Sequence, residues 1–309
     1  MKREISGLVL VVALSARCGG SSPAAPTAST ETKTTTTTTT TTPTTPTGNT
    51  STFRMYTATS ASGPWTQSTA TVTGHDALGL VDPSPILMPD GSILLYYLMS
   101  YMTGGDPAAS QPNNQWKMGV AKSSDNGLTF AHQGVAFTFG SSTTDPFPLM
   151  LESGLIRMLV SQGASVPSVT ARDTTGLTFA TAQDSGFRVT TGGVPGALKI
   201  GSTYYIYGCG SGGIQYFTSS DGMSFSSGTS TGLTSSGTLC DPSPIDAGGG
   251  TYLMAFKRGT TGGPSTDFTY IASSTNGRTW TDLGLIGQGS VPGLVKDRTG
   301  TLRIYVPGS

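Results

Sequence analysis

Three aspartates stand directly before a proline at the start of an apolar segment, and their type and spacing could do chemistry. They are Asp82, Asp145 and Asp241, and each begins the sequence Asp-Pro-x-Pro. Two carboxyl groups in different environments can act as a general acid and a general base. Three that converge could instead bind a hard cation such as Ca²⁺. Because their surroundings are similar, we expect the three aspartates at equivalent positions of a repeated structure.

The repeat has two further copies, in which valine replaces the aspartate. These are Val194-Pro195-Gly196 and Val291-Pro292-Gly293. The five copies lie roughly 50 to 60 residues apart, a period typical of propellers and solenoids. A residue needed only for the turn would be expected in all five copies, so the exchange favours a function for the aspartates. Asp before Pro is also an ordinary turn initiator, so a polar rim without catalytic purpose is the alternative.

Each copy is followed by a polar turn and a β-rich run, which predicts an inner hairpin. A second element then recurs, a Ser/Asp/Gly turn that ends in an aromatic residue, at 123–130, 172–179, 219–225 and 274–280, with a weaker copy at 59–65. Its aspartate can accept backbone N–H groups, its glycine can take a positive φ and its aromatic can pack between sheets. We therefore assign this element a structural role. It resembles the Asp-box of sialidases and related propellers.

The strand count predicts an all-β fold, a five-bladed β-propeller with roughly 50 residues in each blade. The chain starts with an outer strand pair, from Phe53 to Thr59 and from Trp65 onward. It ends with an inner pair, from Pro292 to Asp297 and from Leu302 to Val306. Together these pairs predict a composite closing blade made from both termini, which leaves no free sheet edge.

A five-bladed propeller with Asp-Pro at the heads of its first two inner strands resembles the glycoside hydrolase superfamily of arabinanases, β-xylosidases, invertases and levansucrases. The resemblance implies that Asp82 is the general base and that Asp145 orients the site and tunes its pKa. The family's acid is a glutamate in the third blade, where this chain has Val194. The propeller's single glutamate, Glu152, is predicted in a hairpin turn on the opposite face. The acid would then be Asp241 or a loop aspartate, from the set Asp76, Asp106, Asp184 and Asp267.

Four further residues are candidates for substrate binding. His75 and Asp76 could orient a carboxylate or ligate a metal, or form a solvated loop pair. Trp116 could stack on a sugar, or pack between blades. Arg258, with Lys257, ends an inner strand near the expected site and could pair with Asp241, which would lower the pKa of that aspartate. No Cys/His zinc spacing occurs, so no metal ligand is assigned.

Charge and composition restrict the partners. Seventeen basic residues balance seventeen acidic ones, and charged residues are only 11% of the chain. No basic field exists to attract nucleic acid or an anionic membrane, so a neutral glycan is the expected partner of a monomeric protein. We expect an exported glycoside hydrolase-like propeller that needs no cofactor. The alternative is a non-catalytic carbohydrate- or ligand-binding propeller, with Ca²⁺ as a conceivable ligand.

The N-terminus resembles the signal sequence of bacterial lipoproteins. Residues 1–18 combine a basic start, an apolar core and Cys18 at the position of lipidation, although Arg17 stands where that motif has a small residue. Residues 19–52 are rich in Thr, Pro and Ser and predict a disordered linker, which leaves 53–309 as the propeller. The expected location is the outer cell surface or the periplasm, by a lipid on Cys18 or as a secreted protein.

Two cysteines remain if Cys18 carries lipid. Cys209 follows the third predicted inner hairpin and Cys240 precedes the fourth, so both lie on one face of adjacent blades. An even pair in an oxidising compartment favours a disulfide. Two buried free thiols are the alternative.

Overall fold

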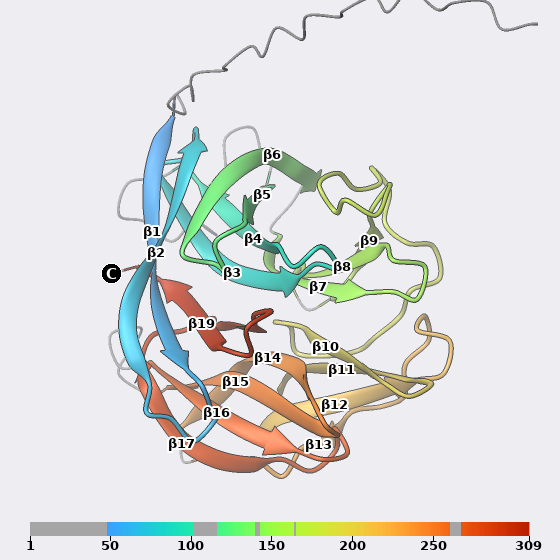
Figure 1. Cartoon of the computed structure of the whole chain (residues 1–309). Helices are drawn as coiled ribbons and strands as arrows, with labels where there is room; N and C mark the ends of the chain where they lie inside the picture. Colours follow the sequence, from blue (N-terminus) through green and yellow to red (C-terminus); the bar gives the residue numbers. More distant parts are fainter. Residues whose placement is uncertain are drawn as a thin grey trace, which may run out of the picture. The chain divides into compact units, whose positions relative to one another are not determined.

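The structure is a computed structural model that describes residues 48–101, 116–139, 143–163, 165–235, 237–259 and 267–308. All regular elements within these ranges are β-strands (Figure 1). They include no helix that is long and apolar enough to cross a membrane. The predicted signal sequence with Cys18, nearly all of the predicted linker, and Asp106 lie outside the described residues.

The largest sheet contains eight strands and consists of two halves of four strands each. One half combines both ends of the propeller in the order β18-β19-β1-β2, and the other has the order β3-β4-β5-β6. A short parallel pairing between β2 and β6 joins them. The bounds are β1 Asn49–Ala58, β2 Thr66–His75, β3 Gly79–Leu87, β4 Ile93–Ser100, β5 Trp116–Ser123, β6 Thr129–Phe139, β18 Gly293–Lys296 and β19 Leu302–Pro307.

The other described strands form three smaller antiparallel sheets, each with its strands in chain order. The first contains β7 Thr144–Met150, β8 Ile156–Ser161 and β9 Ser168–Thr170. The second contains β10 Gly196–Ile200, β11 Thr203–Gly210, β12 Gly213–Ser219 and β13 Thr229–Ser230. The third contains β14 Thr238–Gly248, β15 Thr251–Gly259, β16 Phe268–Ser274 and β17 Thr281–Gln288.

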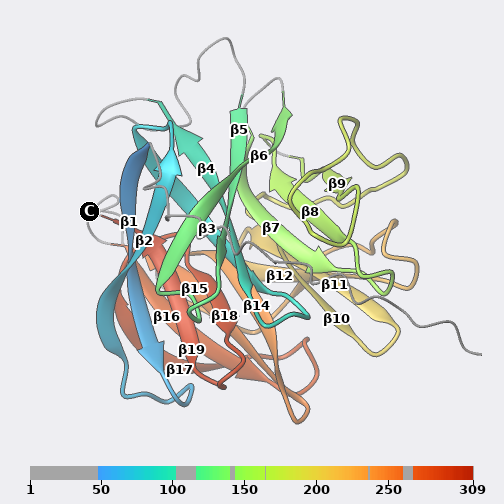
Figure 2. The same cartoon turned by 45° about the horizontal axis from the view of Figure 1, so that its top comes forward.

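The predicted all-β propeller is confirmed, and its strands fall into five groups. The number of blades stays a prediction, with which this grouping is consistent. The composite sheet forms as predicted, because β1 pairs antiparallel with β19 from Phe53 opposite Pro307 to Ala58 opposite Leu302 (Figure 2). The first strand begins at Asn49 rather than at Phe53, since its polar first residues are held by the hydrogen-bonded ladder with β2.

Apolar second strands fill the space between neighbouring sheets. All eight residues of β4 are buried, because sheets cover it on both faces. One core cluster joins β4 and β5 to β8, and another joins β4 to the composite sheet. Tyr96, Tyr97 and Tyr207 are fully buried in this core.

Tyrosine hydroxyl groups connect successive sheets. Tyr305 on β19 donates to the carbonyl of Gly127 at 3.0 Å, in the turn after β5. Tyr96 on β4 donates to Gly176 at 2.7 Å, and Tyr207 on β11 donates to Gly277 at 2.7 Å. Each acceptor lies in one of the recurring Ser/Asp/Gly turns. These turns therefore present a buried carbonyl to the sheet that precedes them in the ring.

Candidate active site

The five repeat copies place one residue each around a shared cavity. We call these the head residues, and they are Asp82, Asp145, Val194, Asp241 and Val291. All five have a positive φ, between 46° and 55°. Aspartate tolerates this left-handed region, whereas a β-branched valine is strained there. The three aspartates thus occupy equivalent positions and converge, as predicted.

A β-bulge aims each aspartate. The pairing register shifts between Val81 and Ser84 on β3, between Thr144 and Phe147 on β7, and between Cys240 and Ser243 on β14. Each shift spans an Asp-Pro pair. A bulge bends the strand and redirects a side chain, and proline lacks the N–H that regular pairing would use. The Asp-Pro dipeptide therefore creates the local geometry that turns the carboxylate toward the cavity.

The cavity among the head residues is small. Its volume is about 20 Å³, and it is lined by the head residues, by the prolines that follow them, and by Ser84, Phe147 and Ser243. A site of this size holds about one water molecule. Among the described residues, the space next to the aspartates is therefore suited to a water or a single substrate group.

Two of the aspartates accept a backbone N–H from the next head residue. Asp82 Oδ2 accepts from the nitrogen of Asp145 at 3.2 Å, and Asp241 Oδ2 accepts from the nitrogen of Val291 at 3.0 Å. At the nitrogen of Val194 this role is taken by Ser161 Oγ, at 2.6 Å. Asp82 and Asp241 therefore connect neighbouring sheets. At the equivalent place after Asp145, the N–H of Val194 is accepted by Ser161 instead of by the aspartate. Nothing in the sequence marked Ser161.

The glycine that follows Val-Pro in the two valine copies has a physical reason. A Cβ on Gly196 would collide with the carbonyl oxygen of Pro242, and one on Gly293 would collide with that of Pro83. The backbones of two adjacent sheets thus meet directly after Val194 and after Val291. This close packing accounts for the glycine of each Val-Pro-Gly copy, where the aspartate copies have Ser or Phe. It does not account for the valine itself, which nothing in the structure explains.

Burial and charge change the acidity of Asp145. Its carboxyl accepts a hydrogen bond from Thr144 Oγ1 at 2.6 Å, and it retains some surface in the narrow cavity although protein surrounds it. Burial and the nearby charge of Asp241 raise the pKa of Asp145 to about 6, against hydrogen bonds from Thr144 and Ser161 and the charge of Lys257. Asp145 is therefore a carboxyl group that can hold a proton at mildly acidic pH.

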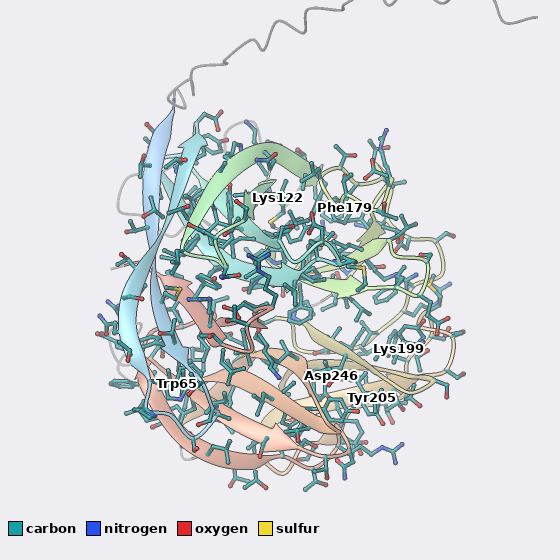
Figure 3. All side chains as sticks on the ribbon, viewed as in Figure 1. Trp65, Lys122, Phe179, Lys199, Tyr205 and Asp246 are labelled. Carbon is teal, nitrogen blue, oxygen red and sulfur yellow. A yellow bond between two sulfur atoms is a disulfide. The ribbon has the colours of Figure 1, made fainter. Side chains whose placement is uncertain are left out.

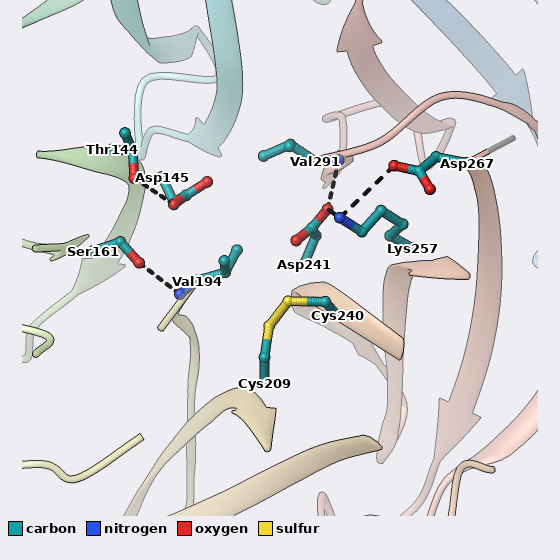
Figure 4. The surroundings of a disulfide bond; sticks show 10 residues. All are labelled: Thr144, Asp145, Ser161, Val194, Cys209, Cys240, Asp241, Lys257, Asp267 and Val291. Atoms are coloured by element: carbon teal, nitrogen blue, oxygen red, sulfur yellow. Dashed lines mark hydrogen bonds and ion pairs between the residues drawn. A yellow bond between two sulfur atoms is a disulfide. The ribbon is translucent and has the colours of Figure 1, made fainter. Parts of the chain in front are cut away.

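Asp241 is sealed in the protein and paired with a lysine. It is 4% exposed, and Lys257 Nζ lies 3.2 Å from its Oδ2 and 3.8 Å from Asp267 Oδ2 (Figure 4). The expected pairing with Lys257 occurs, but the expected lowering of the Asp241 pKa is wrong. Burial raises that pKa and outweighs the opposing effect of Lys257.

Arg258 points away from the aspartates. Lys257 and Arg258 are consecutive on β15, so their side chains leave opposite faces of the strand. Arg258 pairs with Asp282 at 2.6 Å and lies over the ring of Tyr270, 4.1 Å from its centre. The predicted pairing of Arg258 with Asp241 is therefore wrong.

The other three substrate-binding candidates also lie outside the aspartate cavity. Trp116 is 3% exposed and packs in the core between sheets, the alternative that the sequence left open. His75 is 1% exposed, so it is not part of a solvated loop pair, and burial lowers its pKa. Asp76 accepts a hydrogen bond from the hydroxyl of Tyr101 at 2.9 Å.

The remaining carboxylates are engaged elsewhere. Asp184 accepts from Ser168 at 2.7 Å and from Thr170 at 2.9 Å. Glu152 lies in the turn between β7 and β8, at the strand end opposite Asp145, and pairs with Lys199. Neither residue lines the aspartate cavity, so neither supplies there the glutamate that the resemblance to glycoside hydrolases would imply.

Cys209 and Cys240, the predicted pair, form a disulfide with Cα atoms 4.9 Å apart. It joins the β10–β13 sheet to the β14–β17 sheet, directly before Asp241. Among the described residues, these two cysteines and Asp241 are the only group close enough to hold a metal, but the disulfide occupies both sulfurs. The three axial aspartates form no such group, so the geometry gives no support to a Ca²⁺ site.

The comparisons with known proteins agree on the fold. No protein-family model matches the sequence, and no curated protein matches it. The catalytic domain of a GH62 α-L-arabinofuranosidase from Coprinopsis cinerea has a TM-score of 0.54 and 11% identity, covering 82% of this chain and 97% of that one. An endo-1,4-β-xylanase from Bacteroides thetaiotaomicron has a TM-score of 0.53 and 15% identity, covering 75% and 85%. A family 117 glycoside hydrolase from Zobellia galactanivorans has a TM-score of 0.52 and 12% identity, covering 74% and 84%. At such identities the similarity is one of fold, that of a β-propeller.

Proposed function

We propose that this protein is an exported glycoside hydrolase-like propeller that acts on a neutral glycan through its axial aspartates. The observation that carries the proposal is the environment of Asp145. Its carboxyl has a pKa raised to about 6, and its backbone N–H donates to the carboxylate of the head residue Asp82. Glycoside hydrolysis requires two carboxyl groups whose environments separate their pKa values, one protonated and one ionised.

The roles follow from these environments. Asp145 is the general acid, because it holds its proton up to about pH 6. Asp82, which retains partly exposed surface in the same cavity, is the general base. Asp241 is sealed and therefore acts as a positioning residue, whose charge raises the pKa of Asp145. This assignment exchanges the roles that the sequence suggested for Asp145 and Asp241.

Two further observations support the choice of substrate. The solved structures of similar fold include an α-L-arabinofuranosidase and an endo-1,4-β-xylanase, which act on uncharged sugars. The balanced charge of this chain provides no field for an ionised polymer. The proposal also includes export, either with a lipid on Cys18 or by secretion, and the identification of the recurring turns as sialidase-type Asp-boxes. Both parts rest on the sequence alone.

The experiment is a hydrolysis screen of the full chain on uncharged aryl glycosides, arabinan and xylan. Asp145→Asn and Asp82→Asn should each reduce kcat by at least about 100-fold, because each removes one proton-transfer group. Asp173→Asn, an exposed turn residue, is the matched control. Full activity in Asp145→Asn would contradict the role of Asp145 as the general acid. Failure of the wild-type protein to cleave any member of the panel would refute the proposed hydrolase activity.

A second candidate is a carbohydrate-binding propeller without catalysis. The observation in its favour is that Asp82 and Asp241 both hold the next head residue in place, a structural use that needs no chemistry. The discriminating result is a glycan array on which the wild-type protein binds a sugar that it does not hydrolyse. In that case Asp145→Asn should leave the binding intact.

A further inference from the structure

A lysine lies next to the acidic residues of the aspartate cavity. Lys257 Nζ is 3.2 Å from Asp241 Oδ2 and 3.8 Å from Asp267 Oδ2, so the ammonium group bridges two carboxylates (Figure 4). The lysine belongs to β15, where it pairs with Cys240, the residue before Asp241 on β14. The charge of Asp145 also acts on Lys257. One cation therefore serves three carboxyl groups, and no other cation pairs with any of them within the described ranges.

The two head carboxyl groups nearest this lysine differ in their partners. Asp241 contacts the ammonium group and accepts the backbone N–H of Val291 at 3.0 Å. Asp145 forms no ion pair within the described part of the chain, and its carboxyl accepts the hydroxyl of Thr144 at 2.6 Å. Ionisation of both groups would leave a buried negative charge without a cation of its own, which is costly. One proton is therefore favoured, on the carboxyl group that lacks the cation.

We propose that Lys257 is a positioning residue, which keeps Asp241 ionised and thereby confines the single proton of the Asp145–Asp241 pair to Asp145. The inference deepens the proposed function and rests on it, because the retained proton is the one that the general acid donates. Among the other head residues, Asp82 on β3 is the remaining carboxylate, and the two valines carry no charge. Without the lysine, the sealed Asp241 would take the proton, and Asp145 would be left ionised and unable to act as the acid.

Carbon-13 NMR titration of the full chain, with labelled aspartate carboxyl carbons, tests which group holds the proton. The variants Asp145→Asn and Asp241→Asn assign the two signals. In the wild type, Asp241 should ionise at lower pH than Asp145. In Lys257→Met the order should reverse, because Asp241 loses its cation and should ionise about one pH unit or more above its wild-type midpoint. The wild-type order in Lys257→Met would overturn the proposal.

A second background shows whether Lys257 acts through Asp241. In the wild-type background, Lys257→Met should lower the pKa of Asp145, because the neighbouring Asp241 becomes neutral. In the Asp241→Asn background the same substitution should instead raise the pKa of Asp145, since only the direct attraction between Lys257 and Asp145 is then lost. A lowering of equal size in both backgrounds would contradict a role that is exerted through Asp241.

Two variants test the proposal even if Lys257→Met does not fold. Lys257→Arg keeps the charge and should retain the wild-type order of ionisation. Asp267→Asn removes a negative neighbour and should lower the pKa of Asp241, and a rise would contradict the proposal. Lys122→Met is the matched control, because Lys122 is also paired with an aspartate, Asp90 at 3.0 Å, but does not line the cavity (Figure 3). A reversal of the order in this control would show that no specific contact of Lys257 is responsible.

The NMR titration needs no substrate, so this proposal and the hydrolase activity can fail separately. If the wild type cleaves a glycan, the basic limb of kcat/KM in Lys257→Met should move to lower pH together with the ionisation of Asp145. Cleavage with a basic limb that does not move would leave the hydrolase in place and overturn the role of Lys257. A reversed order of ionisation in a protein that cleaves no glycan would support the control of the proton by Lys257 and refute the hydrolase.

Discussion

The carboxylate of Asp82 accepts the backbone N–H of Asp145 at 3.2 Å, so two carboxyl groups proposed as base and acid are joined through the main chain of one of them. The separation between the two sheets at this point is fixed by that bond. The carboxyl of Asp145 is left to interact with Thr144, Ser161 and the charge of Asp241. This hydrogen bond thus connects two neighbouring sheets of the ring and leaves the two carboxyl groups in different surroundings.

The pH dependence of activity should follow the charge of Asp241. If Asp145 is the acid, the basic limb of kcat/KM lies near pH 6, where that group loses its proton. Asp241→Asn removes a negative neighbour that raises the pKa of Asp145, so the basic limb should move to lower pH. The check is a pH–rate profile of both proteins. A limb that stays in place would show that Asp145 is not the group being titrated.

The stability of the fold should also depend on the proton of Asp145. Its folded pKa of about 6 exceeds the unfolded value of about 3.9, so its contribution is fully present below pH 4 and is lost as pH rises through 6. Because asparagine does not ionise, the Asp145→Asn variant does not lose this stability as pH rises. Its free energy of unfolding, relative to wild type, should therefore gain about 2 kcal/mol between pH 4 and pH 7.

Urea unfolding of both proteins at the two pH values measures this difference. A decrease in the stability of the variant relative to wild type as pH rises would contradict the prediction.

Removal of the disulfide should destabilise the propeller. The bridge closes a segment with a sequence separation of 31. Restricting that segment in the unfolded chain corresponds to about 3.5 kcal/mol of stability. The double variant Cys209→Ser, Cys240→Ser should show this loss in denaturant unfolding. The comparison is the wild type after reduction, which should lose a similar amount, and an unchanged midpoint in both would contradict the prediction.

The tyrosine hydroxyl groups between sheets should contribute individually. Tyr305→Phe leaves the buried carbonyl of Gly127 without its donor, and Tyr207→Phe does the same at Gly277. An unsatisfied buried acceptor costs about 1 to 3 kcal/mol. Thermal and urea unfolding check each variant. Tyr204→Phe, which alters a half-buried tyrosine on the same strand as Tyr207, is the control and should change stability by less than about 0.5 kcal/mol.

Much of the fold could be predicted because its signals are local. Turn residues such as those of Asp90-Gly91 start hairpins, and apolar runs such as β4 are strands with both faces covered. The repeat then placed Asp82, Asp145 and Asp241 at equivalent strand heads, since equal local sequence adopts equal local geometry. The pairing of Cys209 with Cys240 followed from the same counting of strands.

The chemistry of the site depends on contacts between different sheets, which spacing along the chain does not specify. The replacement of a carboxylate by Ser161 at the nitrogen of Val194 is one example, and the direction taken by Arg258 is another. The raised pKa of Asp145 has the same origin, because desolvation and the field of Asp241 exist only once the ring is closed. The sequence by itself determined which carboxylates meet at the axis. Only the tertiary structure decided which of them holds a proton, because that depends on burial and on charges brought close from other strands.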